Sequence, residues 1–160
     1  MNIFVLDKNP ILAAQYHCDK HVVKMILETA QILSTSIRLQ GNTSDNVNLY
    51  RITHRGHPCV QWAGQSLANM TWLYRLGVAL CEEYTYRWGK YHNSEPIIQL
   101  CNQLMVYGDY EFNHLTPFVQ AMPDYCKDPD DVVDAYRTYY IMEKKHLLQY
   151  TKREKPSWIG

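Results

Sequence analysis

The chain has 160 residues, of which 46% are hydrophobic, and this length and composition are typical of one folded domain rather than a disordered segment. Its 16 basic and 16 acidic residues cancel, which excludes an overall attraction to a polyanion, so any nucleic-acid surface must be local. The five scattered cysteines form no C-x-x-C pair, and neither a signal peptide nor an apolar run of roughly 18 residues is present, so we expect free thiols in a soluble cytoplasmic protein without membrane contact.

The first expected elements are an extended segment and a long helix. Residues 1–6 (MNIFVL) are expected to form a short strand or an extended lead-in. Asn9 is a favourable helix cap and Pro10 a favourable first-turn residue. Periodic apolar residues then run to Leu39, and Gly41 follows, so one helix is expected over this stretch.

The remainder of the chain predicts further helices and no sheet. No alternating strand pattern appears, so the fold class is mostly α, a single compact domain over residues 1–160 with about four helices. The aromatic residues between 62 and 88 are expected to pack in the core. The later helices are expected at 58–89, 96–108 and about 129–150, with a polar loop at 41–48, an irregular and partly buried segment at 108–128, and a tail at 152–160 ending in an aromatic anchor.

A narrow polar stripe runs along the first expected helix. At about 100° per residue, the polar positions fall on one arc while the rest of the circumference is mainly apolar. An ordinary surface helix shows the reverse pattern. Three interpretations follow: a solvated helix face, a metal site, or a catalytic stripe that lines a cleft. The stripe contains His17, His21, Lys24, Glu28, Gln31 and Thr35.

A metal site is the weaker interpretation of the two stripe histidines. His17 and His21 stand four residues apart, so on one helix they point the same way, and imidazole is a common Zn²⁺ ligand. However, neither H-E-x-x-H nor the deaminase signature is present, and spacing specifies no third ligand. We therefore expect no metal and no other cofactor. The other histidines are His54, His57, His92, His114 and His146.

Several stretches in fixed order resemble one enzyme family. CDKHVVKMILE at 18–28 resembles the helix of the pyrimidine-dimer DNA glycosylases of the phage endonuclease V type, in which a glutamate follows seven residues after a histidine. The start MNIF, HPCVQW at 57–62 and the segment 80–96 are similar to further parts of that family, and the matches keep their order over about residues 1–98. The resemblance implies a phage-type DNA-repair enzyme that cleaves the N-glycosidic bond of a damaged or modified pyrimidine, with an optional lyase step.

The resemblance also implies a division of chemical roles. A carboxylate stabilises the positive charge that develops on the sugar, and Glu28 is the candidate. The nucleophile would be the amine of Met1, since α-amines have a pKa of about 7.7–8.0 against about 10.4 for lysine. His21 would orient Glu28 or contact a phosphate. If the resemblance extends to mechanism, the Met1 amine must lie within a few ångströms of the Glu28 carboxylate.

The chain departs from the family at its DNA-gripping arginines, where it carries Asn2, Leu27 and Gln31. Other cations must then contact DNA phosphates, because phosphate neutralisation dominates DNA affinity. The candidates are Arg51, Arg55, Arg87, Lys90, Lys144, Lys145, Lys152, Arg153 and Lys155. The turn THRGHP at 53–58 is a further phosphate candidate, and three amides at four-residue spacing could form the opposite cleft wall. The expected substrate-binding residues are Asn2, His17, Lys24, Arg51, Arg55, His57, Gln61, Gln65, Asn69, Arg87 and His92.

The preferred function is therefore a monomeric DNA glycosylase, acting on DNA or on a nucleotide. Two alternatives belong to other classes of protein. One is a metal-dependent hydrolase that uses His17 and His21. The other is a small phage-type protein that binds a nucleotide or a partner without catalysis.

Overall fold

The computed structural model describes residues 1–160 and confirms a mostly α fold, with one isolated bridge between Ser66 and Phe112 in place of a sheet. Four single 3-10 turns lie at 105–107, 124–126, 145–147 and 157–159. No helix is both long and apolar enough to cross a bilayer. The helices are α1 (Pro10–Tyr16), α2 (Asp19–Leu39), α3 (Pro58–Ala63), α4 (Leu67–Trp88), α5 (Glu95–Leu104) and α6 (Val132–Glu143).

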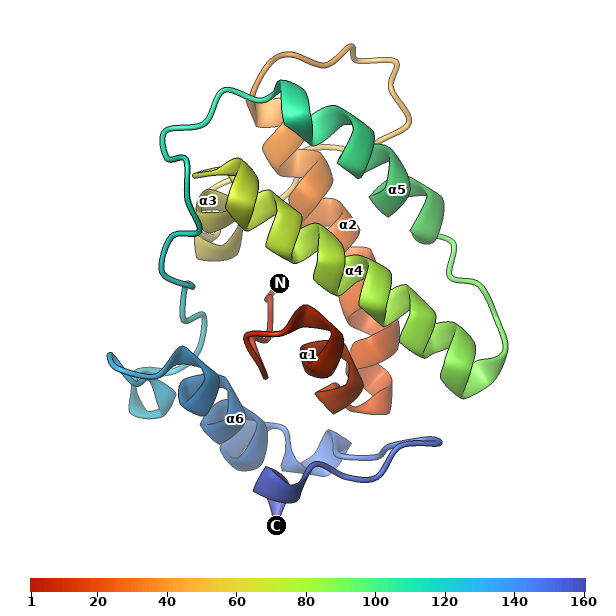
Figure 1. Ribbon diagram of the computed structural model, residues 1–160, viewed down its shortest axis with the longest axis vertical. Helices are drawn as coiled ribbons and strands as arrows, with labels where there is room; N and C mark the ends of the chain where they lie inside the picture. Colours follow the sequence, from red (N-terminus) through yellow and green to blue (C-terminus); the bar gives the residue numbers. More distant parts are fainter.

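Helix α2 is the centre of the packing. It contacts α3, α4 and α5, while α1 packs on α4. In Figure 1, α6 and the C-terminal tail lie below α1, and the N-terminus ends near the middle of the molecule. The lead-in, expected to be a strand or extended, pairs with no strand and turns at Phe4, whose φ is 31°, and its residues 3–6 are buried in the same hydrophobic cluster as the helices. The chain terminus is thereby drawn toward the interior.

The first long helix expected from the sequence is two helices. Both His17 and Cys18 have extended backbone angles between α1 and α2. The new helix begins at Asp19, whose backbone N–H donates to the Gln149 carbonyl and whose carboxylate accepts from Thr151. The partners lie in the C-terminal tail, so no local periodicity could reveal the break.

The second long helix is also divided, at Gly64–Ser66. Helix α3 ends at Gly64, and the Ser66 hydroxyl accepts the N–H of Asn69, which caps α4. The expected core role is confirmed for Trp62 and Trp72, which are buried against Phe118. The last helix ends at Glu143 and not near 150, whereas Trp158 packs edge-on against Tyr16 as the expected aromatic anchor.

Arg87 is a structural residue and not a DNA contact. Its side chain is fully buried, and its guanidinium pairs with Asp19 at 2.9 Å and with Glu83 at 3.0 Å. A third bond goes to the Gln15 carbonyl at 3.0 Å. Glu83 is also held by Arg153 at 2.7 Å. The expectation that Arg87 binds substrate is therefore wrong, because all three of its guanidinium nitrogens are hydrogen-bonded to groups inside the protein.

We predict that Arg87→Met lowers the free energy of unfolding by about 3–5 kcal/mol, because it leaves Glu83 and Asp19 partly buried with fewer partners. Urea denaturation measures this change. The control is Arg75→Met on the exposed face of the same helix, for which we expect a change within about 0.5 kcal/mol. Equal effects of the two substitutions would contradict a structural role for Arg87.

Candidate active site

The α-amine of Met1 and the carboxylate of Glu28 form a buried ion pair. The nitrogen lies 2.9 Å from Glu28 Oε1, and the side chains are 2% and 9% exposed. The expected proximity is thus confirmed. Glu28 Oε2 is buried without a hydrogen-bond partner, and the nearest cation is Lys24 Nζ at 3.7 Å. One carboxylate oxygen therefore holds the amine, and the other is free to act on a further group.

A tight turn in the lead-in directs Met1 back toward α2. Asn2 Oδ1 accepts the N–H groups of Ile3 at 2.7 Å and Phe4 at 3.1 Å. Phe4 has a positive φ of 31°, which costs energy for a residue with a side chain and persists only when its surroundings impose it. Asn2 Nδ2 donates to the Ala121 carbonyl at 2.8 Å. Asn2, expected to contact substrate, is buried and instead shapes this turn.

The ring of Phe4 lies in an aromatic cage that includes His21. The two ring centroids are 4.5 Å apart with the planes inclined by 30°. His21 Nδ1 lies 2.6 Å from the Tyr140 hydroxyl and makes no hydrogen bond to Glu28. Tyr139 stacks on Phe4 at 5.9 Å. His21 therefore packs against the turn through Phe4 and is not hydrogen-bonded to Glu28 as expected, and neither Phe4 nor Tyr140 carried a local sequence signal of this contact.

His17 belongs to the same buried region although it is not on α2. It is fully buried at the end of α1, and its Nδ1 donates to the Ala13 carbonyl at 2.6 Å, which leaves Nε2 without a partner. Burial lowers the pKa of His17 to about 4 and, together with the His17 charge, that of His21 to about 3. Both rings are thus neutral at pH 7, so neither can serve as a cation for phosphate.

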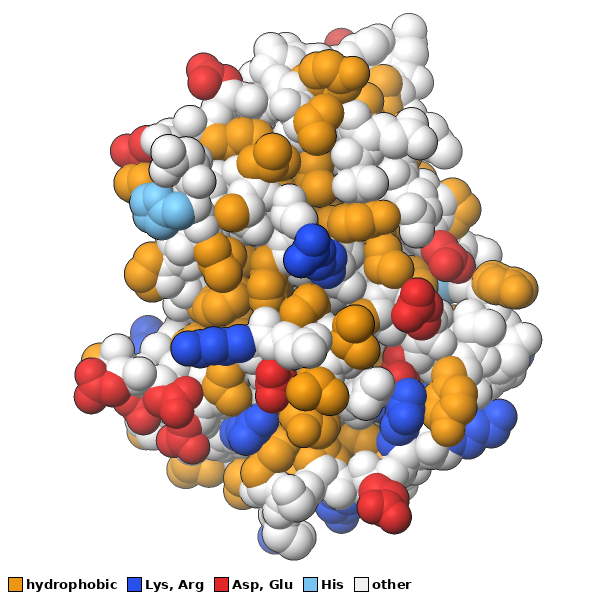
Figure 2. Space-filling model, in the orientation of Figure 1, with side chains coloured by type: hydrophobic (Ala, Val, Ile, Leu, Met, Phe, Trp, Pro, Cys, Tyr) orange, Lys and Arg blue, Asp and Glu red, His pale blue; other side chains and the backbone are white.

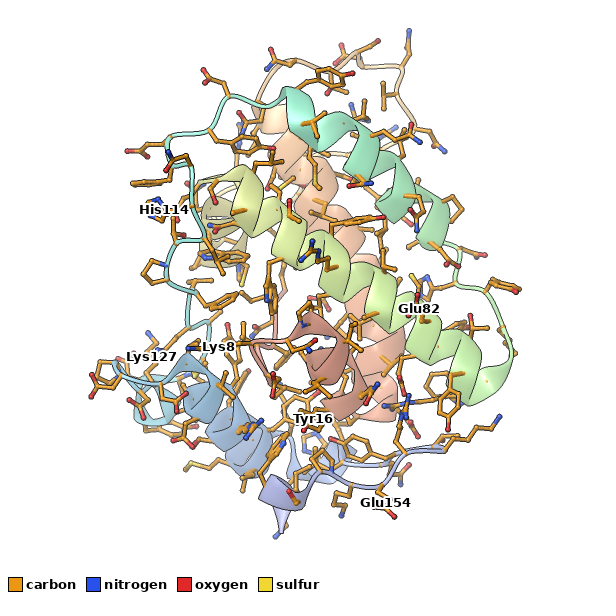
Figure 3. The ribbon with its side chains drawn as sticks, in the orientation of Figure 1. Lys8, Tyr16, Glu82, His114, Lys127 and Glu154 are labelled. Carbon is orange, nitrogen blue, oxygen red and sulfur yellow. The ribbon has the colours of Figure 1, made fainter.

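The solvated-face interpretation fails for four of the six stripe residues, since His17, His21, Glu28 and Thr35 are all buried. Lys24 is exposed and fits it. The expected common cleft is not among the five principal cavities, with volumes of about 150 to 590 Å³, because none of them is lined by Met1 or Glu28. The largest, about 590 Å³, lies between the start of α1 and α4, where Figure 3 shows Glu82.

The segment before α3 carries exposed basic side chains and runs beside α2. Thr53 accepts from and donates to Thr35 of α2, which places this segment beside α2. His57 caps α3 through its Nδ1, and burial, the Met1 amine and His54 together lower its pKa, while Glu28 opposes them. The amine, Glu28 and His57 therefore share one electrostatic environment. Arg51, His54 and Arg55 are exposed on the same segment.

Of the three amides expected to form one cleft wall, Gln61 and Gln65 line a common cavity of about 310 Å³, whereas Asn69 does not. Asn69 is fully buried and bonds the Trp62 carbonyl and Thr116. Gln65 accepts from the Thr116 hydroxyl, and Gln61 donates to the Arg55 carbonyl. All three amides therefore bond groups of the protein, and the cavity that Gln61 and Gln65 share is lined by neither Met1 nor Glu28.

The other expected contacts lie apart from the amine. His92 caps the turn before α5 by accepting the N–H of Ser94, and its ring packs edge-on against Tyr84. Lys90 is exposed beyond the end of α4, and Lys152 contacts the carbonyl of Tyr86. No group of three or more histidine, cysteine or acidic side chains is arranged to hold a metal ion.

The chain belongs to the pyrimidine dimer DNA glycosylase family, since the model of that family matches residues 1–99. The match covers the lead-in and α1–α4, and therefore Met1 and Glu28, but ends inside α5. No curated protein and no solved structure matches the chain. Ala121, Tyr136 and Tyr140, which contact the lead-in, lie outside the matched region.

We predict that acid destabilises the fold through its buried histidines. The pKa of His21 in the fold is about 3, below the ordinary value of 6.5, so the unfolded chain binds the extra proton between these limits. The free energy of unfolding is then fully present above pH 6.5 and falls as the pH is lowered toward 4. Urea unfolding at pH 7 and at pH 4.5 measures this change. Between these pH values, His21→Asn should lose roughly 2 kcal/mol less of its free energy of unfolding than the wild type does. His114→Asn, at an exposed position, is the control; the same pH dependence in all three proteins would contradict the prediction.

Proposed function

We propose that the protein is a DNA N-glycosylase for damaged or modified pyrimidines, with Met1 as nucleophile and Glu28 as its carboxylate partner. The observation that carries the proposal is the 2.9 Å contact between the Met1 amine and Glu28 Oε1, within the part of the chain that matches the family. This separation lies in the range over which a general base takes a proton. Glu28 can therefore deprotonate the ammonium and leave a neutral amine.

The proposed reaction begins with attack of the neutral amine on the anomeric carbon of the sugar. The new C–N bond replaces the bond to the base, which leaves with the electron pair and a proton. Opening of the sugar ring then gives an imine between Met1 and the former anomeric carbon. Glu28 stabilises the cationic transition state and moves the protons.

A lyase step is a natural continuation of the same intermediate. The imine acidifies the neighbouring carbon, so a base can remove a proton there. The carbon–oxygen bond to the 3′-phosphate then breaks, and water finally hydrolyses the imine to return the amine. The free Oε2 of Glu28 is the nearest carboxylate oxygen that the amine does not already occupy.

DNA binding must reach the carboxylate, because the Glu28 side chain is 9% exposed and pairs with the Met1 amine. Lys24, whose side chain is 69% exposed, covers the Oε2 side of Glu28 and can exchange its contact for a phosphate. Arg51 and Arg55 are exposed on the neighbouring segment. We propose that these local cations replace the arginines that the family has at positions 2, 27 and 31.

We predict that Glu28→Gln lowers glycosylase turnover on ultraviolet-irradiated DNA on the order of 100-fold or more. Folding should be nearly intact, since glutamine keeps the size of the side chain and its amide oxygen can still accept a hydrogen bond from the amine. Glu82→Gln, on the exposed face of α4, is the matched control. Borohydride should trap a covalent complex between DNA and Met1 in the wild type, and a variant extended by two residues before Met1 should give none. Full activity of the extended variant would exclude the imine route.

We also predict that Arg55→Ala reduces the salt dependence of DNA affinity by about one counterion in the slope of log K against log salt. The control is Lys127→Ala. Lys127 pairs with Asp124 at 2.9 Å in an acidic loop at the edge of the molecule (Figure 3), so its loss should leave the slope unchanged. An identical slope for Arg55→Ala and the wild type would remove this segment from the DNA surface.

A further inference from the structure

The side chain of Asn2 connects the terminal turn to a part of the chain outside the family match. Its amide oxygen accepts two backbone N–H groups of the turn, and its amide nitrogen donates to the Ala121 carbonyl at 2.8 Å. The side chain is buried, so water does not compete for these bonds. The residue that follows the nucleophile is thus held from two sides.

The 119–121 segment is itself held by α6. The Tyr136 hydroxyl donates to the Val119 carbonyl at 2.7 Å and accepts the Ala121 N–H at 3.3 Å. The Tyr136 ring is fully buried and packs edge-on against Phe4 at 6.1 Å. Through Tyr136, helix α6 therefore contacts both Ala121, whose carbonyl accepts from Asn2, and the ring of Phe4 at the end of the turn.

We propose that Asn2 is a positioning residue for the Met1 amine, and that the 119–121 segment with Tyr136 is the support on which it acts. The inference rests on the proposed function, in which this amine is the nucleophile. Attack requires the reacting atoms to approach within about 3–3.5 Å, and a misplacement of about 1 Å can cost 100-fold in rate. Glu28 is the polar contact of the amine itself. The position of the amine therefore also depends on the turn formed by residues 2–4.

Three substitutions separate positioning from general stability. Asn2→Leu removes all three side-chain hydrogen bonds but keeps a bulky second residue, so the initiator methionine is retained. Tyr136→Phe removes only the hydroxyl beneath the 119–121 segment and leaves Met1, Asn2 and Glu28 unchanged. Tyr110→Phe is the matched control, since the Tyr110 hydroxyl also donates to a carbonyl, that of Met105 at 2.6 Å, away from the lead-in.

The first measurement needs no glycosylase activity. An amine-reactive acetylating reagent is applied at low concentration, and mass spectrometry follows modification at Met1 against time. The wild-type amine should react slowly because its 2.9 Å contact with Glu28 Oε1 competes with the reagent. We expect modification at least tenfold faster in Asn2→Leu, an intermediate increase in Tyr136→Phe and the wild-type rate in Tyr110→Phe. The same rate in all four proteins would overturn the proposal. If Asn2→Leu does not fold, the proposal is decided by comparing the modification rate at Met1 in Tyr136→Phe with the rate in Tyr110→Phe.

The second measurement is borohydride trapping in a single turnover on ultraviolet-irradiated DNA, together with the dissociation constant for that DNA. We expect a trapping rate at least tenfold lower in Asn2→Leu with an unchanged dissociation constant. If Asn2→Leu is trapped as fast as the wild type, the positioning role is overturned and the proposed function still stands. No trapping in the wild type would overturn the proposed function, and the acetylation rates would still decide whether Asn2 places the amine.

Discussion

Burial of the lead-in is the constraint on which the rest of the site depends. Residues 3–6 are almost fully buried, and their apolar side chains favour this position because it removes them from water. The same burial brings the positive charge of the terminus into the interior, where an unpaired charge is costly. Glu28 supplies the counter-charge. The Asn2 bonds and the cage around Phe4 are what allow the chain to make this turn.

Two acids on α2, the partly buried Asp19 and the buried Glu28, have different surroundings, and the difference separates a structural role from a chemical one. Asp19 is one part of a network in which Arg87, Glu83 and Arg153 satisfy one another and join α2, α4 and the tail. Glu28 instead faces a titratable amine and keeps one oxygen without a hydrogen bond. An incompletely satisfied buried acid beside a titratable group in a strained turn is more typical of a functional site than of a packing contact.

The neutral net charge of the chain conceals a local asymmetry. Lys24 on α2 and Arg51 and Arg55 on the segment beside α2 are exposed cations, whereas five aspartates fall between residues 124 and 134. The face formed by α1, α4 and α5 carries apolar side chains along its centre with both charge signs scattered around them (Figure 2). Overall charge therefore says little about where DNA would bind, because electrostatic attraction acts over about one Debye length.

The sequence by itself determined the helical class, the caps at Asn9 and Gly89, and the pairing of Met1 with Glu28, the last through the order of family-like segments. These features depend on local periodicity, on backbone preferences or on a recognisable pattern. Only the tertiary structure decided that two long helices are each broken, that Arg87 and Asn69 are internal, and that α6 reaches the terminal turn. Each of those outcomes depends on hydrogen bonds and charges between residues far apart in the chain, and local patterns carry no information about which distant groups will meet.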